Sequence, residues 1–154
     1  MFVHIGWGRP VQINSNNFTS NLSRETCELL ISLAGPLMNI ILAFIFMIIY
    51  YALVLFTNVS MLFLLVVSGI VAVNIGLGVF NLLPIPPLDG SKIFRRFLPY
   101  SAKEWLDRNM QTIYIVFMVL WITGLLSHIV APVISVISNG MEHVVAWIFG
   151  LFIK

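Results

Sequence analysis

The sequence predicts an all-α polytopic membrane protein, with about four transmembrane helices and a short N-terminal β-strand or hairpin segment at the membrane. Apolar residues make up 60% of the 154-residue chain and charged residues only 9%, whereas soluble domains carry about 25% charged residues. The mean hydropathy is +1.01. The apolar residues also gather in runs long enough to cross a hydrocarbon layer of about 30 Å, so lipid must be the main solvent of this chain.

The first 28 residues form a strand and loop segment that precedes the first span. Residues 11–14 (VQIN) alternate apolar and polar side chains, with glycine and proline nearby, which predicts a short strand or hairpin. Ser23 followed by Glu25 is typical of a helix start. Residues 1–10 lack the cationic start and apolar core of a cleavable signal peptide.

Four apolar stretches are long enough to be considered as spans. The first two cover about 29–56 and 61–83, and the third covers about 111–126. The last, 129–153, is interrupted by Ser-Asn-Gly at 138–140, so it is either one bent crossing or a half-helix followed by an interfacial helix. No repeat or extramembrane domain is visible, and residues 1–154 are predicted to form a single membrane-embedded domain.

The distribution of positive charge predicts which side of the membrane each loop faces. The loop 57–60 carries no charge, whereas the segment 91–108 holds a cluster of cations: Lys92, Arg95, Arg96, Lys103 and Arg108. Because such residues remain in the cytoplasm, 91–108 is predicted to lie there, in contact with anionic lipid. Two crossings separate it from residues 1–28, so both lie on the same side. The net charge of +2 is too small and dispersed to suggest a nucleic-acid partner, and the single cysteine, Cys27, permits no intramolecular disulfide.

The stretch NLLPIPPLDG at 81–90 places a carboxylate at the end of the second span. Insertion scales assign about 2.5 to 3.5 kcal/mol to an aspartate at a helix centre, so Asp89 should face a partner, a cavity or an ion. One interpretation is that Asp89 caps a short interfacial helix over 91–98, with Gly90 easing the turn.

Three prolines favour a different interpretation. Pro84, Pro86 and Pro87 remove backbone donors and exclude helical conformation at the residues before them, which predicts an extended segment. Its neighbours are apolar, and unwound backbone at membrane depth is tolerated only where protein or a water cavity meets it. We therefore predict a stiff, buried segment that presents Asp89 inward from the cytoplasmic leaflet.

A second motif, Ala34-Gly35-Pro36, interrupts the first span near its start. Small residues let membrane helices approach closely, so the motif predicts a kink and a packing notch. Asn39 lies one turn from Gly35 on the same helix face, where its amide could bond across to a neighbouring helix.

Four stretches together resemble a known family: GWGRPVQIN (6–14), AGPLMN (34–39), NLLPIPPLDG (81–90) and the tail TGLLSHIVAPVISVI (123–137). They are similar to the site-2 protease family of intramembrane zinc metalloproteases, and most of all to its short bacterial branch. Each motif is weak alone, but the combination at this spacing is specific and covers essentially the whole chain. The resemblance implies a peptidase of the bacterial cytoplasmic membrane that cleaves a transmembrane protein substrate.

The resemblance also implies roles for individual residues. Asp89 would be one ligand of a single zinc ion, and Asn81 would contact the substrate carbonyl or oxyanion. The N-terminal strand would bind substrate through Gly6, Trp7, Gly8, Pro10 and Val11. Structural roles fall to Gly35, Pro36, Asn39, Pro84, Pro86, Pro87 and Gly90.

The chain departs from the family pattern in one important respect. The family has a His-Glu-x-x-His helix, which supplies two zinc ligands and the general base, but here the histidines are His4, His128 and His143 and no two are four residues apart. We expect a chain truncated at its start and inactive as an isolated polypeptide. Two alternatives stay open: a split protease whose partner polypeptide supplies that helix, and a non-catalytic relative.

A function from another class is also compatible with these residues. A transporter subunit or membrane assembly factor could use Asp89 and the span asparagines as a proton or binding path. Its activity would follow the proton gradient rather than zinc. The three prolines favour the protease, because a proton relay does not need them.

Overall fold

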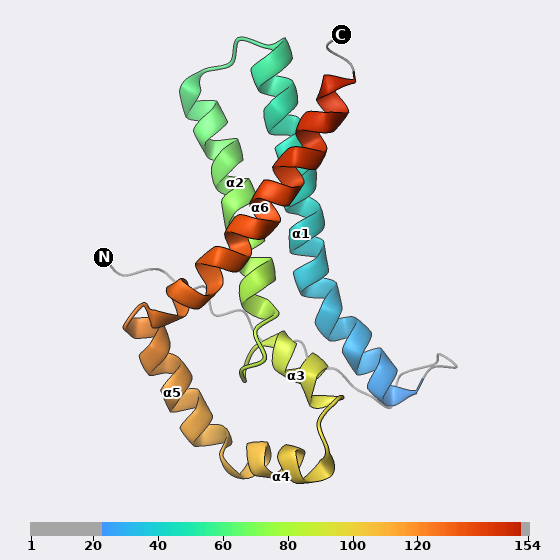
Figure 1. Ribbon diagram of the computed structural model, residues 1–154, viewed down its shortest axis with the longest axis vertical. Helices are drawn as coiled ribbons and strands as arrows, with labels where there is room; N and C mark the ends of the chain where they lie inside the picture. Colours follow the sequence, from blue (N-terminus) through green and yellow to red (C-terminus); the bar gives the residue numbers. More distant parts are fainter. Residues whose placement is uncertain (1–22, 152–154) are drawn as a thin grey trace.

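The computed structural model describes residues 23–151, and the regular elements of this part of the chain are all α-helices, as predicted (Figure 1). The predicted strand at 11–14 lies outside the described residues. The helices are α1 (Arg24–Phe56), α2 (Met61–Asn81), α3 (Asp89–Arg95), α4 (Tyr100–Arg108), α5 (Met110–Ile122) and α6 (Leu125–Gly150).

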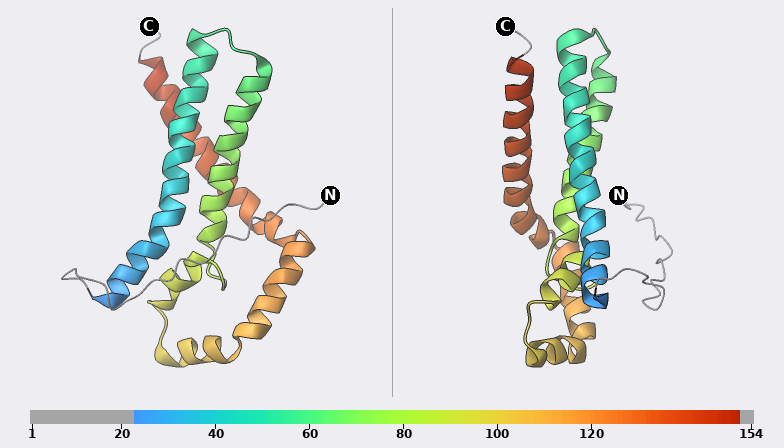
Figure 2. Two further views of the ribbon diagram at one scale, coloured as in Figure 1. Left: turned by 180° about the vertical axis from the view of Figure 1, so that it is seen from behind. Right: turned by 90° about the vertical axis from the view of Figure 1, so that its right-hand side faces the viewer.

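The three long helices form two layers. α1 and α2 make an antiparallel hairpin, and α6 crosses over it as a second layer, which the side view of Figure 2 separates clearly. The short helices α3, α4 and α5 lie together at one end, below the crossing. The start of α1 lies at this same end, whereas the α1–α2 loop and the end of α6 lie at the other.

Serine caps begin both helices of the hairpin. The backbone N–H of Thr26 donates to the Ser23 hydroxyl at 3.3 Å, which confirms the predicted start of α1. Ser60 accepts in the same way from the backbone N–H of Phe63 at 3.4 Å and begins α2. Each serine satisfies a donor that the first turn of a helix leaves unpaired.

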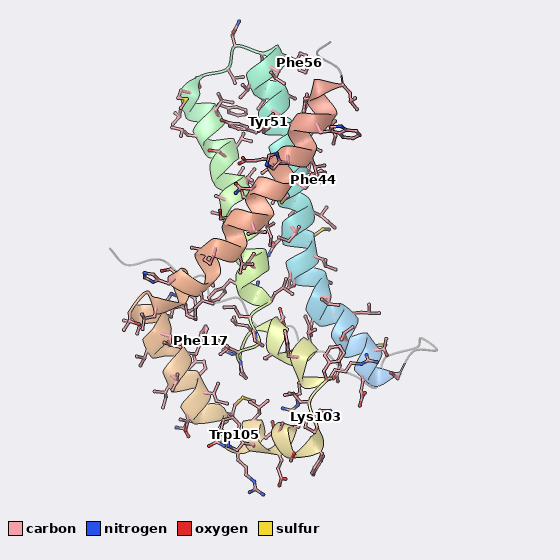
Figure 3. All side chains as sticks on the ribbon, viewed as in Figure 1. Phe44, Tyr51, Phe56, Lys103, Trp105 and Phe117 are labelled. Atoms are coloured by element: carbon pink, nitrogen blue, oxygen red, sulfur yellow. The ribbon has the colours of Figure 1, made fainter. Side chains whose placement is uncertain are left out.

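The core lies where α1, α2 and α6 meet. Ala43, Ile75 and Val145, one from each helix, are 0%, 1% and 0% exposed. Above them the ring of Tyr51 stacks on that of Phe149 at 6.1 Å between centroids, and Figure 3 shows Tyr51 and Phe56 at this upper end. Most other apolar side chains of these helices are exposed, which suits lipid as the surrounding solvent.

Three helices among the described residues, α1, α2 and α6, are long and apolar enough to cross a membrane. The predicted third span is not confirmed as a crossing. In its place α5 has 13 residues, or about 20 Å at 1.5 Å per residue, which is short of the hydrocarbon thickness. The chain breaks after α5 because Gly124 adopts φ 74°, a left-handed conformation that glycine accepts without steric cost.

The last apolar stretch is one helix. α6 runs without interruption from Leu125 to Gly150, through Pro132 and through residues 138–140. The alternative of a half-helix followed by an interfacial helix is therefore wrong. Serine, asparagine and glycine each cost a helix interior no more than about 1 kcal/mol, and the packing of α6 on the hairpin outweighs that preference.

Candidate functional site

The proline segment, residues 82–88, joins α2 to α3 and is not helical, as predicted, but it is turned rather than extended. The backbone N–H of Leu88 donates to the Ile85 carbonyl at 3.0 Å, and the Pro86–Pro87 peptide bond is cis. The turn brings Ile85 and Leu88 into a small apolar core with Phe117 of α5. Leu88 is buried. Burial of these two side chains explains why the segment folds back.

Gly90, two residues after the end of the proline segment, packs against the start of that segment. A Cβ added at Gly90 would overlap the carbonyl group of Leu82 and the carbonyl oxygen of Leu83. The start of α3 therefore packs directly on the backbone that follows α2, at a distance that only glycine permits. The φ angle of Gly90 is not positive, so its structural role comes from this close approach and not from an unusual turn conformation.

Asp89 is the first residue of α3 and is not its cap. The cap position belongs to Leu88, and no side chain bonds to the free backbone donors there. The Nζ of Lys92 instead donates to Asp89 Oδ1 at 3.0 Å, with the two side chains 56% and 37% exposed. The capping interpretation is therefore wrong, and the carboxylate keeps its second oxygen for another partner.

That second oxygen lies toward Gly35 of α1. A Cβ built on Gly35 would come 4.0 Å from Asp89 Oδ2, so α1 presents its smallest residue type to the carboxylate. The two motifs that the sequence analysis singled out are thus neighbours in space. A larger side chain at Gly35 would narrow the approach to Asp89.

Pro36 and Gly78 make the close contact between α1 and α2. Pro36 is fully buried, and α1 continues through it. A Cβ on Gly78 would lie 2.8 Å from Ile40 Cδ1 and 3.2 Å from the Pro36 carbonyl oxygen. The predicted packing notch therefore exists, but Gly78 of α2 forms it and Pro36 fills it. The sequence analysis did not assign Gly78 this role, although its small size was a signal.

The asparagines differ in what they bind. The Asn74 amide donates to the Ile70 carbonyl at 2.8 Å within α2. Asn39 and Asn81 are half-buried, and their side-chain amides make no hydrogen bond to another described residue, so the predicted cross-helix bond of Asn39 is not present in this part of the chain. Asn81 is the last residue of α2, at the entrance to the proline segment, and its contact with substrate stays a prediction.

The described residues do not by themselves fit a complete zinc site. Across residues 23–151 no group of three or more His, Cys, Asp or Glu side chains could hold a metal ion. Asp89 offers a single carboxylate. His128, beside the Gly124 carbonyl at 3.4 Å, and His143 form no such group with it. His4 and the predicted substrate strand (Gly6, Trp7, Gly8, Pro10 and Val11) lie outside the described residues.

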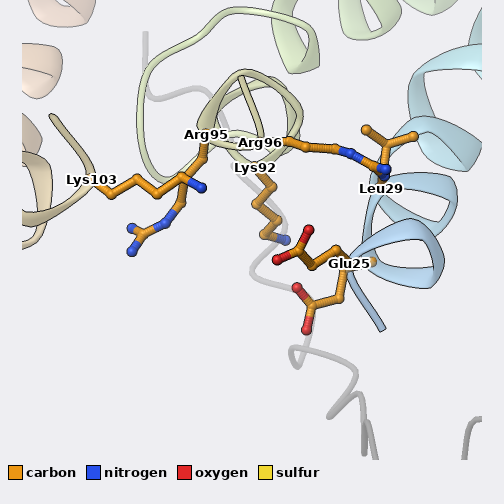
Figure 4. A pocket seen from close by; sticks show the side chains of 7 residues that line it. Glu25, Leu29, Lys92, Arg95, Arg96 and Lys103 are labelled. Carbon is orange, nitrogen blue, oxygen red and sulfur yellow. The ribbon is translucent and has the colours of Figure 1, made fainter. Parts of the chain in front are cut away.

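A charged cavity of about 150 Å³ includes Lys92, the partner of Asp89, in its lining (Figure 4). Its polar lining comes from α1, α3 and α4: Glu25, Glu28, Lys92, Arg95, Arg96 and Lys103. Arg96 Nη1 also donates to the Thr26 hydroxyl at 3.4 Å. The start of α1 and the segment 91–108 therefore lie at the same end of the molecule, as the charge pattern predicted.

One ion pair joins α3 to α4. Arg95 binds both carboxylate oxygens of Asp107, at 2.5 and 2.6 Å. The hydrogen bonds from the guanidinium lower the pKa of Asp107, and the bonds to the carboxylate raise the pKa of Arg95. Two parallel charge-assisted bonds set the orientation of α4 as well as its position.

One carboxylate within an apolar helix was not predicted as a candidate residue. Glu142 of α6 lines a cavity of about 480 Å³ between the three long helices, together with the hydroxyl side chains Tyr50, Tyr51, Ser68 and Ser138. An ionisable residue inside an apolar span was the available signal. This cavity lies in the upper half of the molecule, away from Asp89.

Comparisons with known proteins match the part of the chain that contains the proline segment and Asp89. The model of peptidase family M50 matches residues 57–125, which include α2, the proline segment and Asp89. The protein named "Putative zinc metalloprotease YwhC" of Bacillus subtilis (strain 168) is 34% identical over 138 residues, covering 84% of this chain and 60% of that protein. No solved structure matches the chain.

A second relative comes from an archaeon. "Putative zinc metalloprotease MJ0611" of Methanocaldococcus jannaschii is 37% identical over 92 residues, covering 59% of this chain and 44% of that protein. The match thus spans 60% and 44% of the lengths of these two curated relatives. The family match lies over the proline segment and Asp89, and both relatives carry names of zinc metalloproteases. By these matches the chain belongs to peptidase family M50, the site-2 protease family.

Proposed function

We propose that this chain contributes to an intramembrane zinc endopeptidase that hydrolyses a peptide bond in a transmembrane segment of a substrate protein. Family membership and the names of the two relatives support a zinc peptidase. Three helices able to cross a membrane support an active site within lipid. The charged end, with residues 91–108 and the start of α1, would face the cytoplasm because cations gather there.

Asp89 is the residue that we propose as the zinc ligand. Its carboxylate caps no helix, and one oxygen lies toward Gly35 rather than in a bond. A carboxylate that follows an apolar span, with one oxygen bound to Lys92 and the other toward Gly35, is the observation that carries the proposal. Zinc bound by such a carboxylate and two imidazoles lowers the pKa of its water to about 7. The imidazoles would come from another polypeptide segment with a His-Glu-x-x-His helix.

Asn81 would position the substrate. It ends α2, directly before the segment that presents Asp89, and its amide makes no hydrogen bond to another described residue. An amide N–H aimed at a scissile carbonyl stabilises the negative charge that develops on that oxygen. Asn81→Ala should therefore lower kcat about 10²- to 10³-fold while the bound zinc remains unchanged.

The 154-residue polypeptide alone should not cleave substrate, because it has no His-Glu-x-x-His general base. A test of the proposal supplies that helix as a co-expressed polypeptide and compares Asp89→Asn with Asp107→Asn. Both changes remove one carboxylate charge and one ion pair from the same end of the molecule. Asp107 is the control because Arg95 binds both of its oxygens, which leaves neither free for zinc. Cleavage of a reporter transmembrane helix and zinc content of the purified complex are the two measurements.

We expect Asp89→Asn to lose both cleavage and zinc, and Asp107→Asn to keep both. Full cleavage by the Asp89→Asn complex would refute the role of Asp89. Activity that resists a zinc chelator and instead disappears when the proton gradient is abolished would favour the transporter or assembly-factor alternative.

A further inference from the structure

A large apolar groove opens beside the proline segment. It has a volume of about 640 Å³, within the range of about 300 to 1,000 Å³ that ligand pockets occupy. Its walls come from four elements, the proline segment, α3, α4 and α5, and they include Pro84, Pro86, Phe94, Leu106, Met110 and Tyr114. Such a lining suits a hydrocarbon chain.

The groove adjoins the charged cavity. Lys92 and Arg95 line both spaces, and Arg96 and Lys103 complete the cationic side of the smaller one. An apolar groove therefore lies next to a cluster of cations. A ligand that fits both spaces needs an apolar chain and an anionic head.

The cations differ in how fully they are already paired. Lys92 binds Asp89, and Arg95 binds Asp107 through its two terminal nitrogens. Lys103 makes no ion pair with another described residue. In Figure 4, Lys103 and Arg95 lie on the side of the cavity opposite Glu25. The acids of α1 thus leave the Arg95–Lys103 side as the place for an anion.

The position in the fold identifies the source of such a ligand. Both spaces lie at the end of the membrane-crossing helices where the cations gather. Phe97, Tyr100 and Trp105 are exposed around them, and aromatic residues are enriched at the level of lipid headgroups. Basic pockets at this level bind phospholipid heads.

We propose that an anionic phospholipid binds here, with an acyl chain in the apolar groove and its phosphate at Lys103, the cation of this lining that has no ion pair with another described residue. Free phosphate would contact only the cations and leave the groove unfilled. A zwitterionic phospholipid would bring a choline cation toward this cluster and bind more weakly. Asp89 itself lines neither space, and the proposal does not depend on the proposed function.

The test uses the full chain, purified in a neutral detergent. Three probes are added separately: phosphatidylglycerol, phosphatidylcholine and inorganic phosphate. Native mass spectrometry counts bound lipid, and the unfolding midpoint reports stabilisation. We expect one phosphatidylglycerol to bind at least about tenfold more tightly than phosphatidylcholine, because both carry a phosphate but phosphatidylcholine also brings a cation that the cationic cluster repels.

Matched variants locate the site. Lys103→Gln should weaken phosphatidylglycerol binding about tenfold. Arg108→Gln is the control, because it removes the same charge from the same helix, but Arg108 pairs with Glu104 and lines neither space. The Arg108→Gln variant should bind phosphatidylglycerol with the affinity of the parent. Leu106→Gln, within the groove, should weaken lipid binding severalfold and leave any response to inorganic phosphate unchanged.

Four results would overturn the proposal. Equal affinity for phosphatidylcholine would exclude recognition of the anionic head. Equal losses for Lys103→Gln and Arg108→Gln would reduce the effect to net charge. Full stabilisation by inorganic phosphate alone would assign the cations to a free anion. If Lys103→Gln itself lowers the unfolding midpoint in the absence of lipid, Lys103→Arg is measured instead, because it keeps the positive charge. Lys103→Arg should bind phosphatidylglycerol like the parent, and weaker binding would refute the phosphate contact.

Discussion

The two ends of the molecule are held together in different ways. In the upper part, where α1, α2 and α6 cross, buried Ala43, Ile75 and Val145 pack without any polar contact among them. In the lower part, helices stop and start within a few residues, and a proline turn, a glycine contact and an ion pair join them. Figure 3 shows both, with Tyr51 in the upper part and Lys103 in the lower.

This difference follows from the solvent around each part. Hydrocarbon cannot satisfy free backbone N–H and C=O groups, so only unbroken helices are stable there. Where headgroups and water reach the chain, helices can end, and polar side chains can be presented. The upper part is therefore a scaffold, and the lower part carries the groups suited to chemistry and binding.

The largest effect should come from the upper core. Ile75→Ala removes a fully buried side chain between the three long helices and should cost about 2 to 5 kcal/mol of unfolding free energy. Val73→Ala, on the exposed face of the same helix, should change it by no more than about 0.5 kcal/mol. Thermal unfolding in detergent measures both, and equal losses would contradict the assignment of this core.

A smaller loss is expected at the base of the proline segment. Gly90→Ala forces a Cβ into the backbone of Leu82 and Leu83, which should cost about 1 to 3 kcal/mol. Gly69→Ala serves as the control, because a Cβ there meets nothing within 4 Å and should stabilise α2 by about 0.5 to 1 kcal/mol. Opposite signs in chemical unfolding would confirm that close packing, rather than chain flexibility, requires Gly90.

The ion pair at Asp89 should matter little for stability. Lys92→Gln breaks a pair whose side chains are 56% and 37% exposed, so the unfolding free energy should fall by no more than about 1 kcal/mol. Arg108→Gln breaks the exposed pair with Glu104 and should behave alike. A loss as large as that of Ile75→Ala would show that charge, not packing, holds the lower part.

The smallest expected effect depends on pH. The Arg95 guanidinium holds the pKa of Asp107 below its ordinary value of 3.8. The pair therefore contributes its full stability above pH 3.8, and the contribution is lost as pH falls through the lowered pKa. The carboxyl carbon shift of Asp107, followed by NMR from pH 6 downward, should titrate below 3.8. Arg95→Gln should return the titration to the ordinary value, and an unchanged midpoint would disprove the coupling.

Much of the fold was predictable because hydropathy and backbone chemistry are local properties. Runs of apolar side chains indicated α1, α2 and α6, and the prolines indicated where α2 ends. Cations indicated which segments share an end. The same local signals failed for α5, whose apolar run is long enough in sequence but is cut by Gly124.

The candidate site was predictable in part. The motifs around Gly35 and Asp89 were singled out together, and the structure brings them together. The turn over residues 85–88 and the pairing of Asp89 with Lys92 were not predicted. Proline excludes helix, but it does not choose between an extended chain and a turn.

The amino-acid sequence alone determined that the chain resides in lipid, where its long helices run and which residue types are available for chemistry, because each of these follows from side-chain polarity and backbone restrictions. Packing decided the rest. The proline segment is turned because Ile85 and Leu88 pack into an apolar core. Gly90 lets the start of α3 contact the backbone of Leu82 and Leu83. The energies of contacts between residues far apart in the chain cannot be derived from local sequence patterns. The proximity of Asp89 to Gly35 is therefore known only from the tertiary structure.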